Sequence, residues 1–179
     1  MSRPSLMRTF AAIVLLILLG PALAQDAAQY RVAEGDQLSI RVFGEPDLTL
    51  ETVRVGPQGI ISYPLLGEIR ISGLTATEIE NRLTERLLEG YLKEPQVTVS
   101  ILEYRQFYVN GEVSKPGGYP YRPGLTVEKA ITLAGGFSER ASKGKIRLTP
   151  DGEVGKERKV ELNDPVGPGD IINVGESFF

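Results

Sequence analysis

The chain has 179 residues, of which 41% are hydrophobic and 24% charged, with 20 Lys and Arg against 23 Asp and Glu. It has no histidine and no cysteine, which excludes Ser-His triads, Cys-His dyads, almost every catalytic zinc site and any disulfide framework. The small acidic excess gives no indication of a nucleic-acid partner.

The N-terminus has the three-part pattern of a secretory signal peptide over residues 1–24. Arg3 and Arg8 supply the positive start, residues 10–19 are an unbroken apolar run, and cleavage after Ala24 would follow an A-x-A sequence. The alternative is a retained membrane anchor, but the run is shorter than the about 20 residues that a bilayer span needs. Cleavage would leave 155 residues with 18 basic against 23 acidic side chains, a net charge of −5.

The predicted location of the mature chain is the bacterial periplasm. A lipoprotein signal requires a cysteine as the first mature residue, so no lipid anchor is expected. Eukaryotic secretion is the alternative. The sequence has neither cysteines for disulfides nor N-x-S/T glycosylation sites, and so it gives this alternative no support.

The first part of the mature chain shows strand patterns. Residues 37–43 alternate apolar and polar side chains with period two, directly after a turn signal at Gly35-Asp36. Residues 53–63 predict a hairpin whose connection is residues 56–59.

A helix with clear end signals follows. Thr75 and Glu78 form a capping box, apolar side chains recur every four residues over 79–87, and Gly90 ends the run. Residues 95–102 alternate again and predict another strand. The order strand, hairpin, helix, strand predicts an α+β unit rather than a βαβ series.

The second part begins near Gln106 and is β-rich with one short helix. A strand is predicted at "FYVNGEV", and a turn-rich passage at residues 116–124. Thr126 can cap a helix that Gly135 and Gly136 end, because glycine takes the left-handed conformation at little cost.

The end of the chain repeats a short pattern. Residues 145–154 predict a hairpin with a turn at 150–152, and residues 169–174 a last strand. "VAEGDQLSIRV" and "VGPGDIINV" both place Gly-Asp before an alternating strand, so each Asp side chain can bond the amides of its own turn. We interpret this repeat as two similar turns rather than as the result of a gene duplication.

Two arrangements of catalytic or phosphate-binding residues are disfavoured. Carboxylates alone could serve a glycosidase, but the candidates lie beside Gly or Pro in predicted turns: Asp36, Asp47, Asp151, Asp164 and Asp170. A phosphate-binding loop needs G-x-x-x-x-G-K-[ST] before a helix, whereas the paired glycines here follow one.

Two further features could concern a ligand. Tyr108, Tyr119 and Tyr121 are candidate contacts to sugar or to a neighbouring subunit, and packing within a sheet is the alternative. Residues 140–159 hold seven basic side chains against three acidic ones. This local charge of +4 could meet an anionic polymer or partner, or it could belong to an ordinary solvated hairpin.

Several separate motifs together resemble bacterial polysaccharide export proteins of the Wza type. Three stretches resemble the polysaccharide export domain: "YRVAEGDQLSIRVFGEPDL", "VGPQGIISYPLLGEIRISGLTATEIENRL" and "YLKEPQVTVSI". Two further stretches resemble the soluble-ligand-binding β-grasp (SLBB) domain: "YVNGEVSKPGGYPYRPGLTVEKAITLAGGFSERA" and "VGPGDIINV". The resemblance implies an α+β fold, with a small strand-rich export domain containing one helix at 25–104 and an SLBB domain at 105–179.

The resemblance implies no enzyme activity and no cofactor. Members of this family assemble as homo-oligomeric rings, often octameric, and pass capsule or exopolysaccharide through their lumen. They work with an inner-membrane polysaccharide co-polymerase, often a tyrosine kinase. A monomeric periplasmic saccharide-binding module is the alternative function, and a carboxylate-only glycan hydrolase ranks last.

The C-terminus departs from long members of the family, which continue into further β-grasp repeats and a membrane-crossing amphipathic helix. Only five residues follow the last predicted strand here. We therefore expect a periplasmic protein associated with the outer membrane, without a transmembrane segment in the mature chain, that passes polymer to a separate outer-membrane β-barrel porin. Phe178 and Phe179 could dock on such a partner or pack against a neighbouring subunit.

The resemblance also implies structural roles for a set of turn residues. The family motif comprises Gly35, Asp36, Gly59, Pro64, Gly67, Gly73, Pro95, Gly111, Pro116, Gly117, Gly135, Gly136, Gly169 and Asp170.

Overall fold

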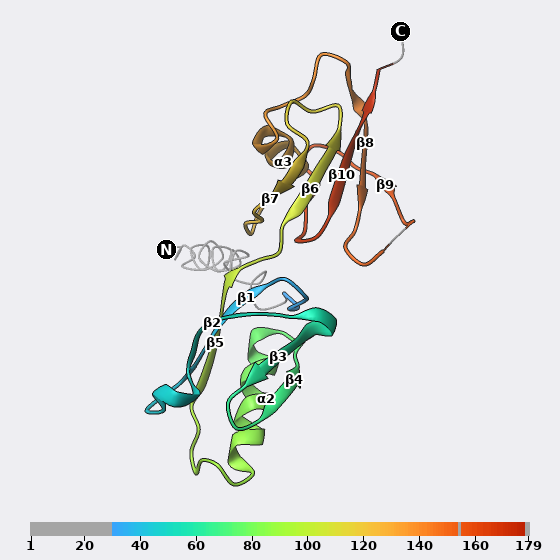
Figure 1. Cartoon of the computed structure of the whole chain (residues 1–179). Helices are drawn as coiled ribbons and strands as arrows, with labels where there is room; N and C mark the ends of the chain where they lie inside the picture. The colour runs from blue at the N-terminus through green and yellow to red at the C-terminus, as the bar shows by residue number, and fades with distance from the viewer. Residues whose placement is uncertain (1–29, 154, 178–179) are drawn as a thin grey trace, which may run out of the picture.

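The computed structural model describes residues 30–153 and 155–177. The predicted signal peptide with its cleavage site at Ala24, and the terminal pair 178–179, lie outside these residues. Figure 1 shows two units placed end to end. Each unit has its own hydrophobic core, and the described chain passes from one to the other through a short connector, residues 104–106.

The N-terminal unit combines a three-stranded sheet, a two-stranded hairpin and one helix. Its elements are β1 (Gln37–Val42), β2 (Leu50–Arg54), β3 (Ile60–Tyr63), β4 (Gly67–Arg70), α2 (Ala76–Leu88) and β5 (Val97–Glu103), with short 3₁₀ turns at Pro46–Leu48 and Pro57–Gly59. The sheet has the order β2-β1-β5 with antiparallel pairing throughout, and β3 pairs with β4. The strands predicted at 37–43 and 95–102 are confirmed as β1 and β5.

The predicted hairpin over residues 53–63 is wrong. β2 pairs with β1, whereas β3 pairs with β4. The Gly56 N–H donates to the Ile60 carbonyl at 2.9 Å, which closes the connection, but no ladder follows. Gly59, at φ +74°, instead lies against Ser72, where an added Cβ would be 1.9 Å from the Ser72 Cβ. Each strand of the predicted hairpin thus pairs with its other neighbour in the sequence, β2 with β1 and β3 with β4.

Helix α2 begins and ends as predicted. The Glu78 amide donates to the Thr75 hydroxyl at 3.2 Å, and the Thr75 amide donates to the Glu78 carboxylate at 2.8 Å. This reciprocal pair satisfies two amides that the first helical turn leaves without partners. Ile79, Leu83 and Leu87 are fully buried in the core of the N-terminal unit. The capping box and the apolar face of the helix are therefore confirmed.

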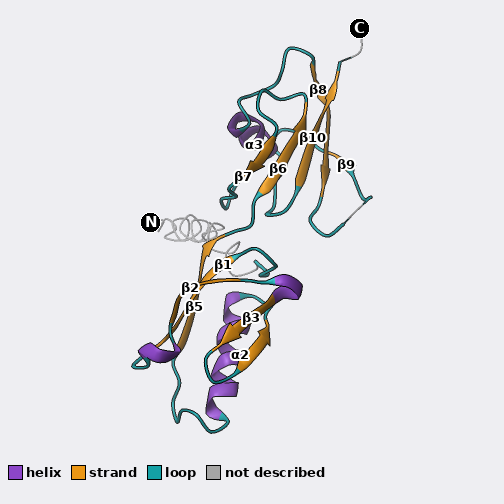
Figure 2. Ribbon diagram, in the orientation of Figure 1, coloured by secondary structure: helices purple, strands orange, loops and turns teal. Residues whose placement is uncertain are grey.

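The C-terminal unit is a five-stranded sheet with one helix on one face (Figure 2). Its elements are β6 (Phe107–Gly111), β7 (Gly117–Tyr119), α3 (Val127–Leu133), β8 (Ala141–Thr149), β9 (Arg158–Lys159) and β10 (Ile171–Glu176). The strand order is β7-β6-β10-β8-β9, in which only the β6–β10 pair is parallel. Both units mix helix and sheet, and the predicted α+β fold class is confirmed.

Three local predictions for the C-terminal unit have mixed outcomes. Thr126 caps α3, since the Lys129 amide donates to its hydroxyl at 3.4 Å. The passage 116–124, predicted as turns, instead contains the edge strand β7, because its glycines pair with β6. The turn at 150–152 is present, with the Glu153 amide donating to the Pro150 carbonyl at 3.1 Å. The strand that returns from it is β9, several residues later than predicted.

We expect Gly111→Ala to destabilise the C-terminal unit strongly. Gly111 has φ +80°, and a Cβ there would lie 2.1 Å from the Val174 carbonyl oxygen, inside the β6–β10 pair. The free energy of unfolding should fall by more than about 3 kcal/mol, since positive φ and a backbone clash combine. Urea unfolding measures this. Gly136→Ala is the control: it has φ +85° and open space around it, so its loss should be about 1 kcal/mol. Equal losses would contradict the prediction.

Candidate functional site

The buried carboxylate of Asp36 lies where the two units meet. Asp36 is fully buried at the end of the turn that leads into β1. Its Oδ2 accepts hydrogen bonds from the Ala33 amide at 2.8 Å and from the Tyr30 hydroxyl at 2.6 Å. Its Oδ1 accepts one from the Arg105 amide at 2.9 Å. A buried carboxylate is costly unless it is paired and hydrogen-bonded, and here it meets both conditions.

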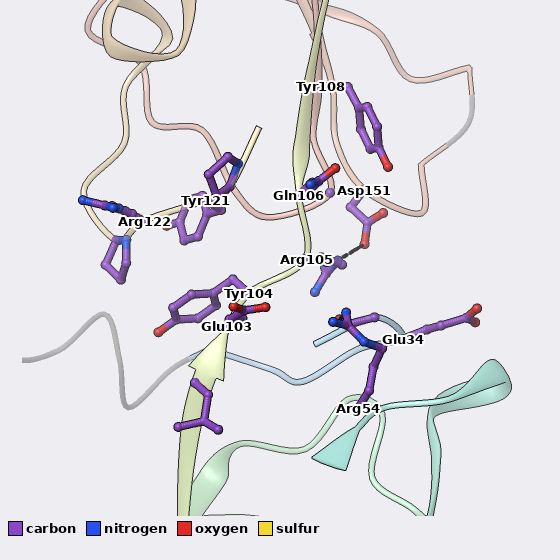
Figure 3. A pocket seen from close by; sticks show the side chains of 15 residues that line it. Glu34, Arg54, Glu103, Tyr104, Arg105, Gln106, Tyr108, Tyr121, Arg122 and Asp151 are labelled. Carbon is purple, nitrogen blue, oxygen red and sulfur yellow. Dashed lines mark hydrogen bonds and ion pairs between the residues drawn. The ribbon is translucent and has the colours of Figure 1, made fainter. Parts of the chain in front are cut away.

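Arg105 joins the two units from the connector. Its guanidinium Nη1 lies 3.5 Å from Asp36 Oδ2 and donates to the Tyr30 hydroxyl at 2.6 Å. On the other side, its Nη2 and Nε donate to one carboxylate oxygen of Asp151 at 2.7 and 3.1 Å (Figure 3). Asp151 lies in the turn after β8, so one side chain binds both units. We call Tyr30, Asp36, Arg105 and Asp151 the junction network.

The phenol of Tyr30 remains protonated in this network. Burial raises the pKa of Tyr30, and the hydrogen bond to Asp36 raises it further. The hydroxyl therefore donates to the carboxylate while it accepts from the Arg105 guanidinium.

A second Gly-Asp turn extends the network into the C-terminal unit. Oδ2 of Asp170 accepts from the Gly167 amide at 2.7 Å, as Asp36 does from the residue three positions before it. Its Oδ1 accepts from the Asp151 amide at 3.1 Å. Burial raises the pKa of Asp170 above its ordinary value. The prediction that both aspartates bond the amides of their own turns is confirmed.

Three tyrosine rings form a second contact between the units. Tyr104 in the connector packs edge-on against Tyr30, with ring centroids 4.8 Å apart, and against Tyr121 at 5.3 Å. Tyr30 belongs to the N-terminal unit and Tyr121 to the C-terminal unit. Edge-to-face rings at such distances attract each other beyond the area they bury.

A cleft of about 860 Å³ opens beside these contacts, between the two units. Figure 3 shows side chains from both units and the connector around it. Its walls include three aromatic and three cationic side chains: Tyr104, Tyr108, Tyr121, Arg54, Arg105 and Arg122. Glu34, Glu103 and Asp151 add carboxylates. Ring faces next to charged and polar groups suit a polar ligand with flat apolar patches, such as a sugar.

The three tyrosines predicted as contacts occupy different surroundings. Tyr108 is 45% exposed and lines the cleft, and Tyr121 lines it while half-buried. Tyr119 does not line the cleft. Its ring packs on Phe107, with centroids 5.9 Å apart, and its hydroxyl donates to the Lys115 carbonyl. For Tyr119 the geometry favours packing within the sheet.

The predicted family-motif residues lie mostly in turns. All of its glycines except Gly117 have a positive φ, and its prolines adjoin β3, β5 and β7. Of these glycines, only Gly35 and Gly169 line the cleft. Gly169 is needed there because an added Cβ would lie 2.5 Å from Asp151 Cγ. Its lack of a side chain lets Asp151 reach Arg105.

Sequence reasoning missed the central role of Arg105. The available signal was a single cation inside an aromatic cluster, at the point where one predicted strand ends and the next begins. Arg54 and Arg122 were missed as well, because nothing in their local sequence distinguishes them from other exposed cations. The seven-residue separation of Tyr30 from β1 likewise gave no indication that its hydroxyl binds Asp36.

The fold and the cleft define an α+β protein in which two separate cores flank one polar junction. Residues 24–102 match the family described as polysaccharide biosynthesis/export protein, and residues 106–160 match the SLBB domain. The chain belongs to the polysaccharide export protein family.

Several relatives carry names that refer to polysaccharides. The exopolysaccharide production protein ExoF of Rhizobium meliloti is 36% identical over 146 residues, and the match covers 75% of this chain and 34% of ExoF. The EPS I polysaccharide export outer membrane protein EpsA of Ralstonia nicotianae is 32% identical over 161 residues, and the match covers 75% of this chain and 42% of EpsA. The polysialic acid transport protein KpsD of Escherichia coli is 29% identical over 117 residues, 63% of this chain and 21% of KpsD. The chain thus spans less than half the length of each of these relatives.

Within residues 30–153 and 155–177, no helix is both long enough and apolar enough to cross a membrane. The same residues contain no cluster of three or more His, Cys, Asp or Glu side chains placed to hold a metal ion.

We expect Asp36→Ala to cost more stability than the matched variant Asp170→Ala. Asp36 accepts three hydrogen bonds and pairs with Arg105, whereas Asp170 accepts two from backbone amides. Breaking the buried pair should cost about 3–5 kcal/mol, and losing the two hydrogen bonds from backbone amides about 1–3 kcal/mol. Urea unfolding of the two variants gives both values, and a larger loss for Asp170→Ala would contradict the assignment of Asp36 as the central contact.

Proposed function

We propose that the protein is a component of a polysaccharide export system, for capsule or exopolysaccharide, and catalyses no reaction. The observation that carries the proposal is the order of the two family matches, which lie on either side of the connector. The names of the relatives, which refer to production, export and transport of polysaccharide, support it. The proposed domains are residues 25–104 and 105–179 after removal of a signal peptide at 1–24.

The finer proposal is a homo-oligomeric ring in the periplasm, associated with the outer membrane. Such a ring would receive polymer from an inner-membrane co-polymerase and pass it to an outer-membrane porin. A conduit requires a polar lining with weak contacts, so that a polymer enters without being held. The cleft with its mixed charges is a surface of this kind. Phe43 is 83% exposed beside a hollow at the β1–β2 turn, and this supports a contact with a neighbouring subunit.

Tyr108 and Tyr121 are the proposed sugar contacts within the cleft. The Tyr108 side chain extends from β6 toward the edge strand β7. An added Cβ on Gly118 of β7 would be 3.0 Å from the Tyr108 ring. The missing side chain at Gly118 therefore leaves room for the Tyr108 ring next to the backbone of β7. A ring held in this way can offer its outer face to a sugar.

Deletion of the gene should abolish or strongly reduce surface polysaccharide, because the proposed conduit would be interrupted. Surface polymer is measured by extraction and sugar analysis, together with the polymer retained inside the cell and in the periplasm. Expression of the wild-type chain should restore export. Unchanged surface polymer, without intracellular or periplasmic accumulation, would remove the export function.

A second function is favoured by the cleft itself, since a cavity between two units is a common place for a small ligand. In that case the protein would be a monomeric saccharide-binding module.

Light scattering of the mature chain separates the export ring from the monomeric binding module. We expect a mass that is a multiple of the chain mass and grows with concentration toward a closed ring. A strict monomer at high concentration, with tight binding to a short oligosaccharide, would favour the binding module instead.

A further inference from the structure

The sheet of the C-terminal unit has one covered face and one open face. Alternate residues of its long strands are buried in one cluster with α3: Phe107, Val109, Ile146, Leu148, Ile172 and Val174. The residues between them are exposed. Because side chains alternate across a strand, these exposed residues share the opposite face, on which none of the described helices packs.

The strand register places polar side chains in one row across the open face. Asn110 of β6 lies beside Asn173 of β10, Asn173 beside Arg147 of β8, and Arg147 beside Lys159 of β9. Neighbouring strands are about 4.8 Å apart, so the row is about 14 Å long. Tyr108 on β6 belongs to the same face, two residues before Asn110, and also lines the cleft. The open face is therefore continuous with the cleft.

A hollow of about 650 Å³ lies at the basic end of this row. Lys145, Arg147 and Lys159 line it together with Asn173, and Gly144 and Gly175 leave backbone without side chains between them. Glu157 is the acidic residue among those that line it. The lining carries three cations against one carboxylate, in a chain whose net charge is −3.

The tertiary structure separates the seven basic residues of 140–159 into different roles. Three have acidic partners elsewhere: Arg140 with Glu112 and Glu176, Lys156 with Glu153, and Arg158 with Asp164. Lys143 lies 5.7 Å from the centre of the Phe137 ring. Lys145, Arg147 and Lys159 line the hollow, and the Lys145 ammonium also donates to the Glu176 carbonyl at 3.2 Å. Arg147 pairs there with Glu157 at 3.0 Å, yet its side chain is still 63% exposed.

We propose that this hollow binds the carboxylate groups of an acidic polysaccharide. The inference rests on the proposed function for the identity of the polymer and adds its chemical class. A guanidinium can hold a carboxylate through two parallel hydrogen bonds, and lysines add charge without fixed geometry. The amides of Asn110 and Asn173 both donate and accept, as sugar hydroxyls require. Tyr108 supplies a ring face for an adjacent sugar.

An acidic protein segment would also be attracted to the same three cations. The row of neutral amides and the tyrosine at its end favour a sugar chain, because hydroxyl groups and ring faces match them along the whole row. The binding test includes an acidic polypeptide, so that this other class of ligand is one of its outcomes.

The test is a calorimetric titration of the mature chain with oligogalacturonate, a uronic acid polymer. Two probes accompany it: the same oligomer with its carboxyls reduced to alcohols, and poly-L-glutamate. At about 50 mM NaCl we expect oligogalacturonate to bind best of the three, and we expect its affinity to fall as salt rises, because exposed charges are screened. The reduced oligomer should bind weakly and with little salt dependence.

Three variants localise the interaction. The double variant R147Q/K159Q should lower the affinity for oligogalacturonate by about tenfold, since each exposed charge contributes modestly. E157Q should raise the affinity, an effect that a folding defect would not produce. K93Q, an exposed charge in the N-terminal unit, is the matched control and should change nothing.

Equal binding of the native and reduced oligomers, no binding of either, or unchanged affinity in R147Q/K159Q would overturn the inference. Tighter binding of poly-L-glutamate would assign the hollow to an acidic protein segment. The gene deletion distinguishes this result from a failure of the export function. If deletion removes surface polymer while the variants bind normally, only the inference fails; if surface polymer is unchanged, the export function fails whatever the titration shows.

Discussion

The carboxylate of Asp36 constrains the whole junction, because a buried charge must find partners or cost several kcal/mol. Its partners come from the segment before β1 and from the connector, which are close in space only when the N-terminal unit is folded. Arg105 then carries the constraint into the C-terminal unit by binding Asp151. The connector is therefore held on both sides, although it is only three residues long.

The cleft depends on this attachment, and the open sheet face of the C-terminal unit adjoins the cleft. With Arg105 held, Tyr104 is placed between Tyr30 and Tyr121, and the walls of the cleft come from two units with separate cores. Tyr108 leads from the cleft onto the sheet face where Arg147 and Lys159 lie. A polymer in contact with the cleft could thus continue along the open face of the C-terminal unit.

Elements whose sequence signals lie within a few consecutive residues could be predicted well. Thr75 and Glu78 bond each other across one helical turn, so their spacing alone indicates the start of α2. The hairpin prediction failed where a strand has a possible partner on each side of it in the sequence. The segment 53–63 has the local pattern of a hairpin, but β1 and β4 compete for its strands and form the larger contacts. The candidate site was predicted only in part, because the network of Arg105 joins residues up to 75 positions apart.

The sequence by itself determined the α+β class, the capped helices, the two Gly-Asp turns and the absence of histidine and cysteine chemistry, since each of these depends on composition or on neighbours within one turn. Only the tertiary structure decided which strands pair, which of the seven cations of 140–159 gather in one hollow, and which tyrosines reach the cleft. The physical reason is that a carboxylate, a cation or a ring acts on whatever lies within a few ångströms. Folding brings distant residues within that range, and the order of residues along the chain does not show which ones.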